Sequence, residues 1–250
     1  MLDAVKRHWP AYLIEAAGLA LFVISASVLT TLLEHPGSPV RQAIRPAFAR
    51  RVVMGLGLGT YISLLVYSPW GRRSGAHINP AVTMAFLRLG RIRPWDAAFY
   101  VAAQFAGATA AVQVMRVVIG TAYTHPDVDY VVTEPGPAGP IPAFLAEFVI
   151  SFVLMLVVLT AVDSARLTKL TGVFTGVLIA LYLAVETPLS GMSLNPARTF
   201  GSAFAAGRWT AVWIYFVAPT LAMLLAAELH LRLRKGRNGQ AGPMYPAVTS

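Results

Sequence analysis

Two copies of the tripeptide Asn-Pro-Ala constrain the fold of this 250-residue chain more than any other feature. They are Asn79-Pro80-Ala81 and Asn195-Pro196-Ala197. Asn is a favoured helix N-cap, and Pro is favoured at the first helical position because no intrahelical hydrogen bond needs its missing N–H. Each copy therefore predicts a helix start, over 80–88 and over 196–206. Both segments are too short to cross a bilayer, a pattern typical of channels and transporters with internal repeats.

The remainder of the chain is apolar enough to lie mostly in a membrane. Hydrophobic residues make up 56% of it, charged residues 12%, and the mean hydropathy is +0.62, whereas about a quarter of a soluble domain is charged. A helix needs about 20 apolar residues to cross a bilayer. Six segments meet this length, namely 11–33, 50–68, 95–120, 141–162, 170–187 and 210–231. The first is too long for a signal-peptide core, so we expect it to be retained.

The two halves of the chain also match in detail. Ala11-Tyr12-Leu13-Ile14-Glu15 in the first span resembles Ala143-Phe144-Leu145-Ala146-Glu147 in the fourth. Three spans per half is an odd number, so the second half must insert upside down. We therefore expect an all-α membrane protein with six transmembrane helices and two re-entrant half-helices in an inverted repeat. The repeats are about 11–121 and 141–232 of a single domain 1–236, followed by a disordered tail 237–250.

The distribution of basic residues predicts the orientation. With cytoplasmic termini, 13 Lys and Arg residues lie on the cytoplasmic side and 7 on the other, as the positive-inside rule requires. The net charge of +9 is then a topological signal and does not indicate nucleic-acid binding. The acidic, Pro- and Gly-rich connection 124–140 is expected outside the membrane, linking the halves. The Cys-free, Arg- and Ala-rich composition favours a bacterial inner-membrane location.

The two motifs, read with their flanks, give a resemblance to one family. Residues 74–83 (Ser-Gly-Ala-His-Ile-Asn-Pro-Ala-Val-Thr) and 191–201 (Gly-Met-Ser-Leu-Asn-Pro-Ala-Arg-Thr-Phe-Gly) resemble the two signatures of the aquaporin, or major intrinsic protein, family. The resemblance covers about 10–232. It implies a homotetramer with one pore per subunit, passive conduction of water or small uncharged solutes across a lipid bilayer, and exclusion of protons and ions.

The pore roles follow from membrane physics together with this resemblance. Non-helical backbone at membrane depth must line water or be buried in protein, so loops 74–79 and 190–195 are expected to line the pore. Asn79 and Asn195 should cap their half-helices and direct an amide into the lumen. The resemblance puts Arg198 in the outer constriction.

Supporting roles are predicted for a few further polar residues. By resemblance, Glu15 and Glu147 hold the loop backbones, and His77 is expected to support the first loop. Glu186 is expected to be a solvated helix-end charge. Gln104 is expected to satisfy a neighbouring backbone group.

The selectivity filter departs from the family's water-selective pattern. Counting back from the Asn residues without gaps puts its four positions at Gly59, Leu183, Met192 and Arg198, and one extra residue in 60–78 would replace Gly59 by Leu58. Such a filter is apolar and wider, although Met192 is flexible enough to refill the space. Thr199, Ala203 and Tyr215-Phe216 instead resemble the water type. We therefore expect a water channel that also passes glycerol, urea or metalloid hydroxides, with strict water selectivity as the alternative.

Other classes of function have weaker support. A coupled transporter needs ionisable groups on the substrate path, and only Glu15 and Glu147 are candidates. An enzyme needs a convergent set of catalytic groups, but the five His residues are scattered without ligand spacing and there is no Cys. We therefore predict no enzyme activity, no cofactor and no metal site. A non-conducting member of the same fold stays open as a further alternative.

Overall fold

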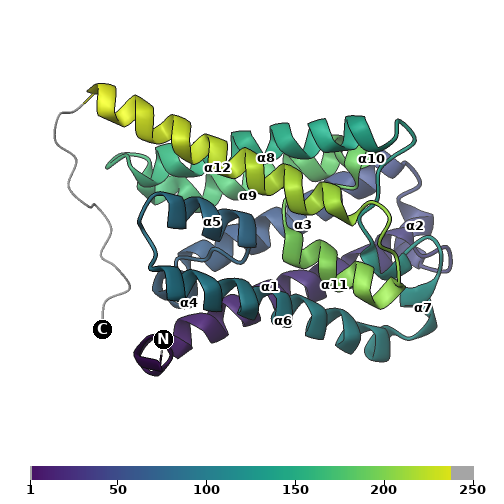
Figure 1. Ribbon diagram of the computed structural model, residues 1–250. Coiled ribbons are helices and arrows are strands. Elements are labelled where there is room, and N and C mark those ends of the chain that lie inside the picture. The colour runs from purple at the N-terminus through teal and green to yellow at the C-terminus, as the bar shows by residue number, and fades with distance from the viewer. Residues whose placement is uncertain (1, 238–250) are drawn as a thin grey trace.

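The computed structural model describes residues 2–237, with the side chains of residues 5–234, as a helical protein (Figure 1). Its helices are α1 (Leu2–Glu34), α2 (Pro39–Ala43), α3 (Ala47–Tyr67), α4 (Pro69–Ser74), α5 (Pro80–Arg88), α6 (Pro94–Ile119), α7 (Thr121–Thr124), η1 (Asp129–Val131), α8 (Pro140–Val162), η2 (Thr168–Leu170), α9 (Thr171–Val185), α10 (Thr187–Ser190), α11 (Pro196–Ala206) and α12 (Val212–Arg237). The described part of the chain contains no strand, which confirms the all-α class.

Six helices in the described residues are long and apolar enough to cross a membrane, namely α1, α3, α6, α8, α9 and α12. They correspond to the six predicted spans. Most limits differ from the predicted ones by no more than three residues. The larger differences are at α1, which begins at Leu2 rather than at residue 11, and at α12, which ends at Arg237 rather than at 231. Most of the expected tail lies outside the described residues, and Arg237 is the last residue of α12.

The half-helices α5 and α11 span the predicted ranges. They begin at Pro80 and Pro196, with Asn79 and Asn195 as N-caps. Both pack against α6 and α12. In Figure 1 they lie one after the other between these two helices, so that together they occupy the length of a single span.

The long helices pack mainly in three pairs, α3 with α9, α1 with α6, and α8 with α12. Small residues make the first two contacts possible. A Cβ on Gly59 would lie 2.3 Å from the carbonyl oxygen of Gly176, and a Cβ on Gly107 would lie 2.3 Å from that of Ala16. Such close backbone approach is typical of helix contacts within membranes.

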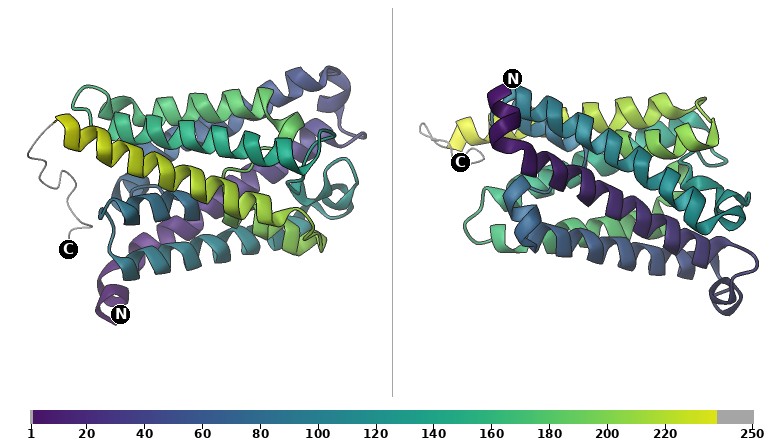
Figure 2. Two further views of the ribbon diagram at one scale, coloured as in Figure 1. Left: turned by 45° about the horizontal axis from the view of Figure 1, so that its top comes forward. Right: turned by 90° about the horizontal axis from the view of Figure 1, so that it is seen from below.

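The two ends of the molecule differ. The N-terminus and the end of α12 lie at one end, as Figures 1 and 2 show from three directions. The connection between the halves, which includes α7 and η1, lies at the opposite end (Figure 1). It is fastened there to the second half, because Gly136 N–H donates to the Leu189 carbonyl at 2.9 Å and Arg208 pairs with Asp129 at 2.7 Å.

Candidate functional site

The two Asn side chains join the halves of the molecule. Each side-chain oxygen caps its own half-helix, since Ala81 N–H donates to Asn79 at 2.9 Å and Ala197 N–H donates to Asn195 at 3.1 Å. Each side-chain nitrogen crosses to the other half. Asn79 donates to the Leu194 carbonyl at 2.7 Å, and Asn195 donates to the Ile78 carbonyl at 2.8 Å. One N–H of each amide is used in this way, which leaves the second N–H of each for a solute.

The loops before the two Asn residues have an unusual backbone. Ala76 and Ile78 have φ of 50° and 38°, and Met192 and Leu194 have φ of 54° and 59°. Such left-handed conformations cost about 1–3 kcal/mol for residues other than Gly and persist only where the surroundings enforce them. Within the described residues, no hydrogen bond reaches the carbonyl oxygens of residues 75–77 or 191–193. These oxygens are therefore available as acceptors.

Glu15 holds the first loop in this conformation. It is fully buried and accepts from the N–H groups of His77 at 3.0 Å and Ile78 at 2.5 Å. The Ser74 hydroxyl donates to the same carboxylate at 2.8 Å. Gln104 donates to it at 2.8 Å and to Thr83 at 3.1 Å. The expectation that Gln104 satisfies a backbone group is therefore wrong, because its partners are side chains.

Glu147 makes the same set of contacts in the second half. It is also fully buried and accepts from Ser193 N–H at 2.5 Å, Leu194 N–H at 2.8 Å and the Ser190 hydroxyl at 3.0 Å. A buried carboxylate is tolerated only when it is well hydrogen-bonded. The loop N–H groups therefore satisfy each buried carboxylate, and each carboxylate in turn stabilises the strained conformation of its loop.

Several supporting residues that the sequence does not predict recur in both halves. Tyr100 donates to the Ser74 carbonyl at 2.7 Å, and Tyr215 donates to the Ser190 carbonyl at 2.5 Å. Both serines lie five residues before the Asn of their half. That equal spacing is the signal that could have found them. The tyrosines have no such local signal, because they come from later helices.

His77 occupies the first loop but does not bond to its backbone. Its Nδ1 lies 3.2 Å from the Thr83 hydroxyl, and its ring stacks on Phe86 with centroids 4.7 Å apart. Ser193 takes the equivalent place in the second half, 2.5 Å from the Thr199 hydroxyl. Both contacts brace a loop against its own half-helix.

The predicted filter residues do not all face one another. Met192 and Leu58 are buried in the same apolar cluster, and Leu183 packs against it. Gly59 instead faces α9, where an added Cβ would collide with Gly176. The missing side chain at Gly59 therefore permits helix packing and leaves no space beside Met192. The position next to it, Leu58, is the one that this geometry favours for the filter.

Arg198 follows the second Asn at the start of α11. Its backbone N–H donates to Asn195 at 3.3 Å. In the described part of the protein, its Nη1 atom is buried without a hydrogen-bond partner. A guanidinium nitrogen in that state can donate to a passing solute.

Glu186 is not the solvated charge that the sequence predicts. It lies between α9 and α10, is only 5% exposed, and neither carboxylate oxygen has a hydrogen-bond partner among the described residues. Burial raises its pKa to about 8. The prediction of a solvated Glu186 is wrong because α10 turns back into the protein and covers the end of α9.

A cavity of about 980 Å³ leads to the Asn pair from the end that carries the termini. Asn79, Asn195 and the loop residues 74–78 line it. The filter candidates Leu58, Leu183, Met192 and Arg198 do not. The cavity therefore reaches the two Asn residues from the terminal end and does not extend to the filter candidates.

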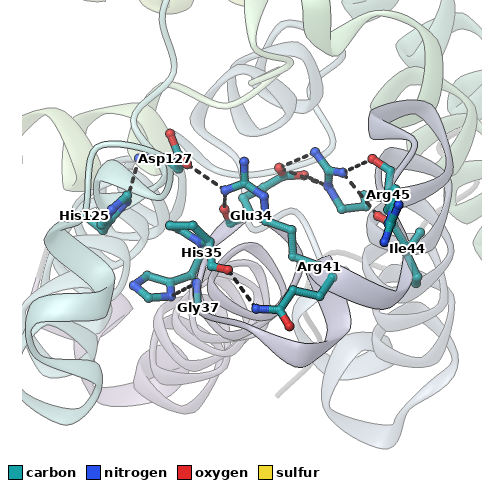
Figure 3. A network of polar contacts seen from close by, with 11 residues as sticks. Glu34, His35, Gly37, Arg41, Ile44, Arg45, His125 and Asp127 are labelled. Carbon is teal, nitrogen blue, oxygen red and sulfur yellow. Dashed lines mark hydrogen bonds and ion pairs between the residues drawn. The ribbon is translucent and has the colours of Figure 1, made fainter.

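A polar network holds the loops at the opposite end (Figure 3). Arg41 donates to Asp127 at 2.6 Å and also to the Glu34 carbonyl. Arg50, 8% exposed, donates to both oxygens of the Glu34 carboxylate, the shortest contact being 2.9 Å. The hydrogen bond from Arg41 holds the pKa of Asp127 below its ordinary value. These contacts tie the segment after α1 to the segment after α7.

Comparison with known proteins agrees with this architecture. The family model described as major intrinsic protein matches residues 3–230. Aquaporin NIP1-3 of Oryza sativa subsp. japonica is 38% identical over 179 residues, which cover 70% of this chain and 60% of that protein. Aquaporin NIP1-1 of Arabidopsis thaliana is 35% identical over 182 residues, with the same two coverages. The chain thus matches about 60% of the length of these curated relatives.

One solved structure shares the fold over nearly the whole chain. It is the X-ray structure of the aquaglyceroporin from Plasmodium falciparum, with a TM-score of 0.74. The match covers 92% of this chain and 98% of that one, at 19% sequence identity. At this identity the likeness establishes the fold alone.

Proposed function

Because this chain belongs to the major intrinsic protein family, we propose that it is a passive transmembrane channel for water and for small uncharged solutes such as glycerol. Its relatives named as aquaporins support the water part of this proposal. The solute part depends on the residues that line the narrowest region.

The Asn pair is the observation that carries the proposal. Two half-helix N-termini meet there, and helix N-termini carry partial positive charge. A water molecule at this point accepts from the free amide N–H groups and donates to the unpartnered loop carbonyls. Such an arrangement interrupts a chain of water-to-water hydrogen bonds and repels cations, so that water passes and protons and ions do not.

The filter is proposed to consist of Leu58, Leu183, Met192 and Arg198. Three apolar side chains and one donor favour a solute with an alkyl face and a hydroxylated face. Leu58 in place of Gly59 makes this filter narrower than the gap-free count predicts. Strict water selectivity is therefore the second candidate, and it is favoured by the burial of Leu58 and Met192, which are 3% and 6% exposed.

Stopped-flow light scattering on proteoliposomes tests the proposal, with protein-free liposomes as the control. Fast shrinkage in sucrose followed by fast reswelling in glycerol supports a channel for water and polyols. Fast shrinkage without reswelling supports strict water selectivity. Shrinkage no faster than in the protein-free control contradicts both. Glycerol uptake that requires an ion gradient indicates a coupled transporter instead.

The placement and assembly of the channel are part of the same proposal. The six spans make it a multi-pass membrane protein, and the excess of basic residues at the terminal end favours cytoplasmic termini. We propose a homotetramer in the cell membrane, in keeping with the family resemblance. A bacterial inner membrane stays a prediction from composition, since the relatives named above are plant proteins.

A further inference from the structure

The charges around the cavity at the terminal end are of one sign. Five cationic side chains line it, from Arg7, Arg72, Arg73, Arg91 and Lys169. Among the described residues, no Asp or Glu lines it. At about 980 Å³ it reaches the upper end of the range usual for ligand sites, which is roughly 300–1,000 Å³.

Four of these cations lack an acidic partner among the residues whose side chains the structure describes. Arg7, Arg72, Arg73 and Lys169 form no ion pair with any residue between 5 and 234. Only Arg91 is paired, to Asp163 at 2.7 Å. Since each of the four is exposed, they present their charge to whatever occupies the mouth of the cavity.

The carboxylates near this end are already occupied. Asp96 accepts from Tyr12 at 2.6 Å and bonds to His8 at 2.8 Å. Asp163 bonds to Arg91, His230 and Arg234 at 2.6 to 2.7 Å. Burial alone would raise the pKa of Asp163, but the hydrogen bonds from Arg91 and His230 hold it below its ordinary value. These groups therefore do not neutralise the unpaired cations.

The deep end of the cavity is electropositive as well. It is formed by Asn79 and Asn195, the N-caps of the nine-residue α5 and the eleven-residue α11. Helix N-termini attract anions. The positive field thus extends from the mouth of the cavity to its floor.

We propose that this vestibule, the cavity lined by Arg7, Arg72, Arg73, Arg91 and Lys169, binds an oxyanion of the phosphate class. The bound group is either free inorganic phosphate or the phosphate of an anionic lipid at the mouth. A basic bias at one membrane face explains cations at this end, but it does not explain their convergence on one cavity without a carboxylate. This site lies at the entrance of the proposed conduction pathway, so its occupant narrows that entrance.

Direct binding is the first test and does not depend on conduction. The full chain in an uncharged detergent is titrated with inorganic phosphate by calorimetry at constant ionic strength. Since hydrogen bonds to charged groups are strong, Arg72→Gln with Arg73→Gln should weaken binding about tenfold or more. Arg116→Gln is the matched control, because Arg116 is also exposed and lies at the far end of α6. It should leave binding unchanged.

Two results would overturn the proposal at this stage. One is that neither phosphate nor, in a parallel titration, a short-chain anionic phospholipid binds the unaltered chain. The other is an equal loss in Arg116→Gln, which would indicate a general charge effect. Because these measurements involve no flux, a failed conduction experiment leaves them interpretable.

Water flux distinguishes the two sources of phosphate. The chain is reconstituted in purely zwitterionic vesicles and in vesicles with anionic phospholipid, with and without phosphate on both sides. Inhibition by phosphate in zwitterionic vesicles identifies the free anion. Slower flux in anionic vesicles, relieved by the double Arg variant, identifies the headgroup. Flux that responds to neither, in a chain shown to conduct water, contradicts an occupant at the entrance.

Discussion

At the scale of single residues, the two buried glutamates show why the site needs charge inside a membrane. Glu15 and Glu147 accept from consecutive loop N–H groups that no helix or strand could satisfy. The left-handed residues beside them keep the loop carbonyls free. Loss of either carboxylate should therefore release a loop as well as leave donors unpaired.

Glu147→Gln tests this dependence. The amide retains one acceptor but turns a second donor toward the Ser193 or Leu194 N–H, which should cost about 1–3 kcal/mol. We expect a lower thermal midpoint in detergent and reduced water flux. Glu134→Gln, at an exposed position paired with Arg208, is the control. Equal midpoints for the two variants would show that Glu147 does not support the loop.

Glu186 should make stability depend on pH. Burial raises its folded pKa to about 8, above the ordinary value of about 4.3. The folded state therefore prefers the neutral acid, and stability should fall as pH rises between these two values and then level off. Glu186→Gln should flatten this decline between pH 5 and pH 8.5, measured as the thermal midpoint at each pH. A decline equally steep in the variant would mean that other groups cause it.

Leu58 decides how wide the proposed filter is. Leu58→Ala removes side-chain volume from the buried cluster that also contains Met192. We expect glycerol permeability to rise relative to water permeability, measured by stopped-flow scattering. Leu64→Ala, at a position 67% exposed on the same helix, should change neither. An unchanged ratio in Leu58→Ala would remove Leu58 from the filter.

At the scale of the element, glycine spacing sets the distance between helices. The α3–α9 contact brings Gly59 against Gly176 and Gly55 against Ala180, with backbone atoms where side chains would be. The positions of the half-helices depend on capping and on hydrogen bonds between the two halves. Their Asn caps and Pro at the first position fix where they begin, and the crossing amides fix where they meet.

Gly59→Ala should therefore act on folding. The added Cβ would lie 2.3 Å from a carbonyl oxygen, and such overpacking typically costs about 1–3 kcal/mol. We expect a lower thermal midpoint and lower yield of folded protein. Gly57→Ala is the matched control, since its Cβ meets only the flexible end of Leu29. A stable Gly59→Ala with altered glycerol flux would return Gly59 to the filter.

At the scale of the whole molecule, the two ends of the passage are built differently. The terminal end is an open vestibule whose cations Arg7, Arg72, Arg73 and Lys169 have no ion pair with residues 5–234, while the loops at the other end carry the ion pairs Arg41–Asp127, Arg50–Glu34 and Arg208–Asp129. The loop network of Figure 3 and the contact between Gly136 and Leu189 close that end around the second half. Water flux should therefore be more sensitive to solutes added on the vestibule side than to solutes added on the opposite side.

The absence of cysteine gives a prediction for the whole chain. Mercuric ions block many pores by binding a thiolate, and this sequence contains no Cys. Water flux through proteoliposomes should therefore be unchanged by mercuric chloride. Met192→Cys, in the buried cluster that also contains Leu58, should make water flux sensitive to mercuric chloride, and reducing agent should reverse that inhibition. If mercuric chloride blocked water flux through the unaltered chain and reducing agent reversed the block, the prediction would be wrong.

The sequence by itself determined the spans and the half-helices. Hydrophobic length and the Asn-Pro pair are local signals, because lipid admits only self-satisfied backbone and a cap acts on the next few residues. The limits of α5 and α11 and the existence of all six spans followed from these signals.

Only the tertiary structure decided which side chains meet. Helix rotation turned Gly59 toward α9 and placed Leu58 in the apolar cluster that contains Met192, a difference of one residue that hydropathy cannot register. The return of α10 into the protein buried Glu186. The four cations without an ion pair among residues 5–234 gathered at one cavity from α1, α4 and η2. Contacts between residues distant in sequence depend on packing, which no local pattern specifies.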